Sequence, residues 1–404
     1  MVRIPNQSPL RTWIAVLVLL LGSALTLACQ EKAHPAALAP SNASPKDNSK
    51  PNALEPKRAE FGVGKIVFES TRSLDGTDAL GNKFAANLWI INADGTTLRP
   101  LTNLTADSSD CINAKWSPDG SKIVFESARA LDATNAIGEN YSKNIWVMNN
   151  DGSEVRPLTR LNGVGEHNTQ PQWSPNGNYI IFRSERSGLF NSNRNIWIMK
   201  ADGSGLSSLT NFNDSTALVG APQWSPDGTR IAFFTSKRDT EGVVLWTINV
   251  DGKDLKRLLQ AKNFYAEKSL QWSPDSTKIL ALSPAGLLSI NSDGSGEKIL
   301  ISFAYPDEGM QFQWSPNGTK IAYDSNRNFE GKEIPEGEFT RNIWIMDSDG
   351  NHPKPLTKLT AYFANSKRPQ WSRDSSKIYY ESMRALNGTN EANADPNRRW
   401  SGAI

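Results

Sequence analysis

The sequence predicts an all-β protein whose fold is a β-propeller of four-stranded blades. Two observations lead to this prediction: a turn phrase headed by tryptophan recurs six times, and β-rich runs separate the copies. All but Trp13 of the 13 tryptophans in this 404-residue chain fall within the repeat. Repeats with a period of about 20 to 50 residues are typical of solenoids and propellers, and no stretch after residue 29 has convincing helical periodicity.

The turn phrase reads Trp-Ser-Pro-Asp-Gly or a close variant of it. Its copies begin at Trp116, Trp173, Trp224, Trp272, Trp314 and Trp371. Proline fixes φ at the second position of a turn, aspartate bonds to nearby backbone, and glycine accepts a positive φ. Each phrase therefore predicts a tight turn between the first and second strands of one unit.

Three further strands are expected in each unit. A β-rich run follows each turn phrase, and one more such run precedes the first copy. These runs cover residues 65–68, 122–125, 179–182, 230–233, 278–281, 320–323 and 377–380. The next run is centred on Trp89, Trp146, Trp197, Trp246, Leu288 and Trp344. An Asp-Gly pair then predicts a hairpin, and in four units the last run ends in Leu-Thr. These runs are apolar on both faces, as expected of strands packed between neighbouring sheets.

The number of blades follows from counting these runs. Seven runs of the post-turn type favour seven blades, with Trp400 marking a third strand in the last one. A ring of six blades with a shared closing blade stays open. Closure is expected because it hides the exposed edges of the sheets.

The turn phrase and the strands around it resemble the TolB-like β-propeller repeat. The resemblance covers residues 58–404. It implies a non-catalytic propeller and a periplasmic partner such as a peptidoglycan-associated lipoprotein, and the TolB propeller has six blades. Residues 29–57 are too few for the separate N-terminal α/β domain of TolB, so we do not expect this chain to be TolB proper.

The N-terminal residues predict export and a lipid anchor. Residues 1–28 form a signal peptide, with Arg3 and Arg11 before an apolar run that is short for a bilayer span. The run ends at Cys29 in a sequence that resembles a bacterial lipoprotein processing box, which implies lipidation of Cys29. Ordinary cleavage after Ala28 and an uncleaved anchor remain alternatives. Residues 29–57 predict a flexible tether because they lack large apolar residues. We therefore expect a periplasmic or cell-surface lipoprotein held to the membrane by its lipid alone.

Charge excludes nucleic acid as a partner. Without Arg3 and Arg11 the 44 basic residues fall to 42, which equals the number of acidic residues. Phosphate contacts need a basic face, which a neutral mature chain does not supply. Apart from Cys29, Cys111 is the only cysteine of the mature chain, so we expect it to be an unpaired, small, buried residue. We also expect the protein to be monomeric.

Binding residues are expected on the long, varied loops at the end of the ring opposite the short turns. Three of these loops, in the first, second and last units, share an Arg-x-Leu-Asp/Asn pattern. Their candidate ligand or ion-binding residues are Arg72, Asp75, Asp78, Arg129, Asp132, Asn135, Arg384, Asn387 and Asn390. Their oxygens are of the type that calcium prefers. The alternative is repeat duplication, with Asp and Asn serving the loop turns.

A Ser-x-Arg sequence recurs in every unit except the fifth. Its arginines are Arg72, Arg129, Arg186, Arg238, Arg327 and Arg384. A ring of arginines at a channel mouth could hold an anionic ligand. Recurrence in nearly every unit favours a structural role instead, in which the arginines pair with blade carboxylates.

No recognisable catalytic motif is present. There is no Gly-x-Ser-x-Gly elbow, and His167 and His352 lie too far apart in sequence to predict a multi-histidine metal site. We therefore expect a non-catalytic scaffold that binds an envelope protein or polymer, with no cofactor beyond an optional calcium ion. The alternative is a propeller enzyme, a glycan lyase or hydrolase, with a site at the channel mouth.

Overall fold

The computed structural model describes most of the chain between Gly64 and Ser382. The described residues are 64–71, 74, 86–92, 96–105, 110–133, 138–188, 191–212, 217–237, 242–261, 270–283, 285–302, 310–326, 340–359 and 365–382. The predicted signal peptide, tether and Trp400 strand lie outside them. None of the helices in this part of the chain has the length and apolarity needed to span a bilayer.

Seven antiparallel sheets follow one another in chain order and are called blades 1 to 7. Blade 1 consists of β1 (Lys65–Ser70), β2 (Asn87–Asn92) and β3 (Arg99–Pro100). Blade 2 consists of β4 (Cys111–Trp116), β5 (Lys122–Ser127), β6 (Asn144–Asn149) and β7 (Arg156–Pro157), with a short 3-10 helix η1 (Glu139–Tyr141) between β5 and β6. Blade 3 consists of β8 (His167–Trp173), β9 (Tyr179–Gly188), β10 (Asn191–Lys200) and β11 (Ser207–Ser208).

The remaining blades repeat this order. Blade 4 consists of β12 (Ala217–Trp224), β13 (Arg230–Lys237), β14 (Val243–Asn249) and β15 (Lys256–Ala261). Blade 5 consists of β16 (Leu270–Trp272), β17 (Lys278–Ser283), β18 (Gly286–Asn291) and β19 (Lys298–Ser302). Blade 6 consists of β20 (Phe312–Trp314), β21 (Lys320–Ser325), β22 (Asn342–Asp347) and β23 (Lys354–Pro355). Blade 7 consists of β24 (Ser366–Trp371) and β25 (Ile378–Ser382).

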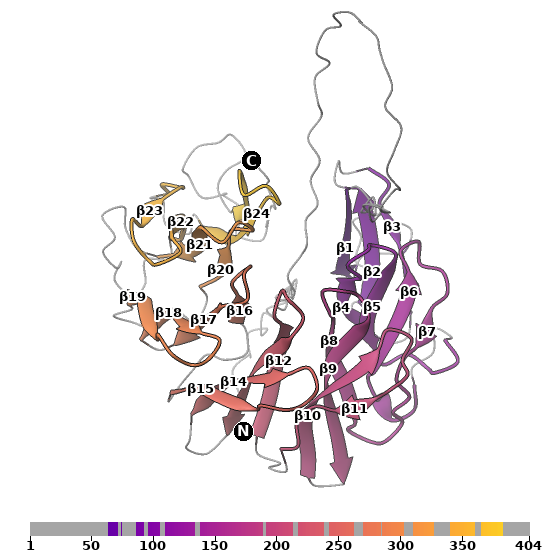
Figure 1. The fold of residues 1–404 in the computed structure, drawn as a ribbon. Helices are drawn as coiled ribbons and strands as arrows, with labels where there is room; N and C mark the ends of the chain where they lie inside the picture. Colours follow the sequence, from indigo (N-terminus) through magenta and orange to yellow (C-terminus); the bar gives the residue numbers. More distant parts are fainter. Residues whose placement is uncertain are drawn as a thin grey trace, which may run out of the picture.

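The sheets succeed one another around a central axis (Figure 1). The first strands of neighbouring blades contact one another, as β8 contacts β4 and β12, and Figure 1 shows these strands on the inner side of the ring. Seven sheets are the number that the favoured blade count predicts. Among the described strands, blades 1 and 7 are the two ends of the series and no strand pairing joins them.

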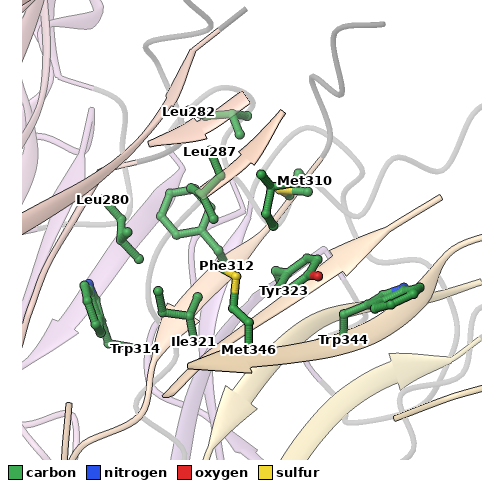
Figure 2. Close-up of a cluster of buried hydrophobic side chains, with 11 residues drawn as sticks. Leu280, Leu282, Leu287, Met310, Phe312, Trp314, Ile321, Tyr323, Trp344 and Met346 are labelled. Atoms are coloured by element: carbon green, nitrogen blue, oxygen red, sulfur yellow. The ribbon is translucent and has the colours of Figure 1, made fainter. Parts of the chain in front are cut away.

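From blade 1 to blade 6, each pair of neighbouring blades encloses an apolar core. Blades 5 and 6 show the arrangement, in which leucines of blade 5 face Phe312, Tyr323 and Trp344 of blade 6 (Figure 2). Strand β21 is buried along nearly its whole length because both of its faces are covered. Complete burial of one large apolar side chain contributes about 1.5–3 kcal/mol. The prediction of strands that are apolar on both faces is therefore confirmed.

The tryptophans of the turn phrase also join the blades. The indole N–H of Trp173 donates to the backbone carbonyl of Lys115 in the preceding blade at 3.2 Å. The indole groups of Trp224, Trp272 and Trp371 donate to the preceding blade in the same way. These tryptophans therefore act in blade packing, as the sequence predicts.

Candidate functional site

The short-turn face of the ring is formed by self-contained turns. In the turn after β4, Ser117 Oγ donates to Asp119 Oδ1 at 2.6 Å and accepts the backbone N–H of Lys122 at 2.9 Å. The same serine–carboxylate or serine–asparagine contact recurs in the other five copies. In the last copy, hydrogen bonds from Ser372 and Ser376 hold the pKa of Asp374 at about 2. These side chains are used to hold the turns.

A second repeated device holds the opposite end of the blades. The buried Asn144 Oδ1 accepts hydrogen bonds from Thr159 Oγ1 at 2.9 Å and from the backbone N–H of Leu161 at 2.7 Å. Thr159 Oγ1 in turn accepts the N–H of Ile145. The other asparagine–threonine pairs are Asn87 with Thr102, Asn195 with Thr210 and Asn342 with Thr357. This clamp explains the Leu-Thr sequence that ends the fourth strand in four units.

The two recurrent arginines that the structure describes, Arg129 and Arg186, lie against tryptophans. The guanidinium carbon of Arg129 lies 5.2 Å from the ring centroid of Trp146. Arg129 is buried, and it also donates to the backbone carbonyl of Ala133. Burial lowers the pKa of Arg129 from its usual value, and the nearby Asp132 opposes that shift. Arg129 thus contacts an aromatic ring and a backbone carbonyl, and the predicted pairing of these arginines with blade carboxylates stays a prediction.

Acidic side chains bridge three of the interfaces between neighbouring blades, which we call seams. Glu69 accepts the backbone N–H of Asn113 at 2.6 Å, and Glu126 accepts that of Gln170 at 2.7 Å. Asp324 accepts that of Arg368 at 3.0 Å. All three amide donors have φ between 55° and 57°. Because a left-handed conformation costs a non-glycine residue about 1–2 kcal/mol, the carboxylates stabilise strained bulges in the first strands.

Charged groups gather around these seams at the long-loop end of the inner strands. Lys143 pairs with Glu126 at 3.6 Å, and Arg341 pairs with Asp324. We call this region the inner rim. It consists of Glu69, Glu126, Lys143, His167, Glu185, Arg194, Asp324, Arg341, Arg368 and Glu381, and we include Lys115, which acts on Glu69 from the short-turn end of β4, one residue before Trp116. In blade 3, the guanidinium group of Arg194 donates two hydrogen bonds, of 2.9 and 2.8 Å, to the carboxylate of Glu185. In blade 7, Arg368 contacts Glu381 at 2.9 Å.

Glu69 and Lys115 are the most perturbed members of the inner rim. Burial raises the pKa of Glu69 from 4.5 to about 7, with Glu126 and Asp110 adding to the rise and the Asn113 amide and Lys115 opposing it. Burial also lowers the pKa of Lys115 from 10.5 to about 8, against the attraction of Glu69. Perturbed groups of this kind are concentrated at functional sites.

His167 lies at a seam position that is occupied by different residue types in different blades. Its Nδ1 accepts the backbone N–H of Lys143 at 3.3 Å. At the equivalent positions, Asp110 accepts the N–H of Ala86 at 2.7 Å and Asn365 accepts that of Arg341 at 2.9 Å. Partial burial is the main cause of the lowered pKa of His167, and Lys143 contributes to it. His167 is thus a seam residue, and no three His, Cys, Asp or Glu side chains gather as a metal site among the described residues.

The structure describes two of the residues predicted to bind a ligand or ion. Arg129 is buried against Trp146, while Asp132 is exposed at the long-loop end. The remaining predicted residues lie outside the described residues: Cys29, Arg72, Asp75, Asp78, Asn135, Arg384, Asn387 and Asn390. The two interpretations of these loops, calcium binding and repeat duplication, therefore both stay predictions.

The inner rim is the part of the candidate site that sequence reasoning missed. One signal for it was present, because the residue before the third-strand asparagine is Lys143, Arg194 and Arg341 in blades 2, 3 and 6. The sequence also contained signals for two structural contacts, the arginine–tryptophan contact and the asparagine–threonine pair. The fifth unit lacks both the Ser-x-Arg arginine and the third-strand tryptophan, and the fourth and fifth units lack both members of the asparagine–threonine pair. Residues that are lost together point to contact between them.

Comparisons with known proteins agree with this fold. No family model matches the chain. It is 29% identical over 145 residues to the uncharacterized peptidase YuxL of Bacillus subtilis (strain 168), covering 35% of this chain and 20% of YuxL. It is 30% identical over 168 residues to the uncharacterized protein Atu1656 of Agrobacterium fabrum, covering 40% of this chain and 50% of that protein. The chain thus spans half or less of the length of these relatives.

A solved structure supports the same conclusion over more of the chain. Oligogalacturonate lyase in complex with manganese matches with a TM-score of 0.55 at 12% identity, covering 79% of this chain and 82% of the lyase. At this identity the likeness concerns the fold alone. The β-propeller implied by the resemblance to TolB-like repeats is therefore confirmed: the chain has the all-β propeller fold shared with oligogalacturonate lyase.

Proposed function

We propose that this protein is an exported, lipid-anchored propeller that binds an envelope protein or polymer through its long-loop end, without catalysis. One observation supports this most directly: the inner rim varies in charge from blade to blade, whereas the short-turn face repeats the same contacts in every copy. Contacts that hold a scaffold together recur in every repeat, whereas binding residues lie on loops where the sequence differs from one repeat to the next.

The described side chains also favour binding over chemistry. Most charged groups of the inner rim are already engaged with one another, as Arg194 is with Glu185. Among the described residues, the two most exposed large hydrophobic side chains are Tyr141 at 62%, in the loop before β6, and Val164 at 68%, in the loop between blades 2 and 3. Exposed aromatic and aliphatic groups beside charged groups are typical of protein interfaces.

Site-specific photo-crosslinking in envelope extract tests this proposal. A crosslinker at Tyr141 is expected to capture a partner, whereas one at Lys253, whose side chain is 83% exposed in a short turn, is not. Leu206, which is 41% exposed beside a short turn, provides an apolar control position. Equal capture from the three positions would contradict the assignment of the binding end. Turnover of a glycan panel by the purified protein would overturn the absence of catalysis and favour the enzyme alternative.

A further inference from the structure

The loop between blades 2 and 3 contains an asparagine followed directly by a glycine, Asn162-Gly163. This pair is chemically labile, because glycine has no side chain to shield its backbone nitrogen from the asparagine side chain. Attack by that nitrogen on the side-chain carbonyl carbon forms a cyclic succinimide and releases ammonia. The described part of the chain contains two more such pairs, Asn176-Gly177 and Asn317-Gly318, both within the turn phrase. The three pairs differ in what holds the reacting atoms.

A carboxylate lies against the backbone nitrogen of Gly163. Glu166 Oε2 accepts the N–H of Gly163 at 3.3 Å, and the backbone N–H of Glu166 donates to the Gly163 carbonyl at 3.2 Å, which keeps the two residues in one turn. Only glycine allows this approach, because a Cβ atom at position 163 would lie 2.6 Å from the carboxyl carbon of Glu166 and 2.7 Å from its Oε2. Glu166 is therefore placed to take the proton that the Gly163 nitrogen must lose when it attacks.

The side chain of Asn162 is exposed, and no other described residue holds it. The contact of Asn162 with the described part of the chain is made by its backbone carbonyl, which accepts Asn140 Nδ2 at 2.6 Å. Ser142 Oγ donates to the following carbonyl, that of Gly163, at 2.7 Å. The backbone on both sides of the reacting nitrogen is thus anchored, while the reacting amide can rotate toward it.

The two pairs in the turn phrase hold the same atoms in hydrogen bonds. Asn176 Oδ1 accepts the hydroxyl of Ser174 at 2.7 Å and the N–H of Asn178 at 3.0 Å. The N–H of Gly177 donates to the Ser174 carbonyl at 2.9 Å. The turn at Asn317-Gly318 makes the corresponding contacts. In these turns both partners of the reaction are already engaged, and no carboxylate faces the glycine nitrogen.

We propose that Asn162 is a site of spontaneous modification, at which deamidation replaces the amide by a carboxylate with Glu166 as the general base. The Gly163 nitrogen passes its proton to Glu166 Oε2 and forms a bond to the side-chain carbonyl carbon of Asn162. The bond from that carbon to the amide nitrogen then breaks, and ammonia leaves with the proton that Glu166 returns. Solvent water opens the ring at either carbonyl, which gives aspartate or isoaspartate.

The product changes the long-loop end of the ring. It adds a carboxylate beside the turn that holds Glu166, and like charges repel one another. Isoaspartate also adds a methylene group to the main chain, which displaces the carbonyls that Asn140 and Ser142 contact. These two contacts tie together the loops that expose Tyr141 and Val164, so the loops should separate as the protein ages.

Mass spectrometry of peptides from the full chain, after incubation at neutral pH in ¹⁸O-labelled water, tests the site. In the folded wild type we expect Asn162 to convert at least about tenfold faster than Asn176 and Asn317, since a positioned base typically contributes about 10²–10⁴-fold. In urea the three rates should approach one another, because all three asparagines precede a glycine. Hydrogen exchange of the Glu166 amide, which donates to Gly163, should accelerate in the converted protein.

A pair of variants tests the role of the base. Glu166→Gln should slow conversion at Asn162 by about tenfold or more while Asn176 keeps its rate. Glu297→Gln removes an exposed carboxylate in another blade and should change neither rate. Melting temperatures verify that both variants are folded. Conversion of Asn162 no faster than that of Asn176 in the folded wild type, or equal conversion of Asn162 in wild type and Glu166→Gln, would overturn the proposal.

Discussion

The guanidinium carbon of Arg186 lies 4.1 Å from the centroid of the Trp197 ring. The two residues come from the second and third strands of blade 3, and Arg129 and Trp146 form the same contact in blade 2. The contact uses the attraction between a cation and the face of an aromatic ring. An arginine that could have been taken for an anion-binding residue is here part of the blade.

Loss of this contact should destabilise the protein modestly. We expect Arg186→Ala to lower the free energy of unfolding by about 1 kcal/mol, because a partly desolvated cation–π contact contributes about that much. Urea unfolding measures the change. Arg257→Ala, on an outer strand where the side chain contacts Gln260, is the matched control and should have little effect. Equal losses in the two variants would contradict the role of the ring contact.

Removal of the asparagine clamp should be more costly. Asn144→Ala leaves the hydroxyl of Thr159 and the backbone N–H of Leu161 without their buried acceptor, so we expect a loss of about 3 kcal/mol in unfolding free energy. Hydrogen exchange of the Leu161 amide should accelerate in step. Asn149→Ala removes an exposed contact with Ser153 and serves as the control. Unchanged protection of Leu161 would speak against the clamp.

His167 should make stability depend on pH. Its pKa is lowered in the folded protein from 6.5, so the unfolded chain takes up the proton first as pH falls. The contribution of His167 is therefore fully present above about pH 6.5 and is lost as pH falls below it. His167→Asn should flatten this dependence while preserving the seam, because Asn365 makes the equivalent bond. The measurement is the difference in melting temperature between wild type and variant from pH 7 to pH 5, and a constant difference would contradict the prediction.

Lipidation is expected at Cys29. Radiolabelled palmitate should label the wild-type protein in its bacterial host and fail to label Cys29→Ala, since the lipid is attached through the cysteine sulfur. Cys111→Ala removes the buried second cysteine and should leave labelling intact. Equal labelling of wild type and Cys29→Ala would refute lipidation at that residue.

Calcium is expected to leave the protein unchanged. Asp132 lies close enough to the Arg129 guanidinium to act on its pKa, and this fixed positive charge opposes a second cation. Calorimetry should show no heat of calcium binding, and the melting temperature should not shift. Heat that disappears in Asp132→Asn would instead support a calcium site on these loops.

Much of the fold could be predicted because each blade is specified locally. The turn after Trp116 is specified by the serine, proline and aspartate that directly follow this tryptophan. The strand that begins at Lys122 is apolar on both faces, and this pattern by itself predicts a strand packed between two sheets. The candidate site is different. The contact between Glu69 and the amide of Asn113 joins residues 44 positions apart in sequence, and no local pattern specifies it.

The sequence by itself determined the repeat, the strands and turns of each blade, and the tryptophans that pack them, because these depend on residue type within one unit. Only the tertiary structure decided which units meet and what their charged groups face. It placed Lys115 beside Glu69 without an ion pair and set Arg129 against Trp146. Burial and neighbouring charge depend on the adjacent blade, and they decide whether a polar residue supports the scaffold or remains available for binding.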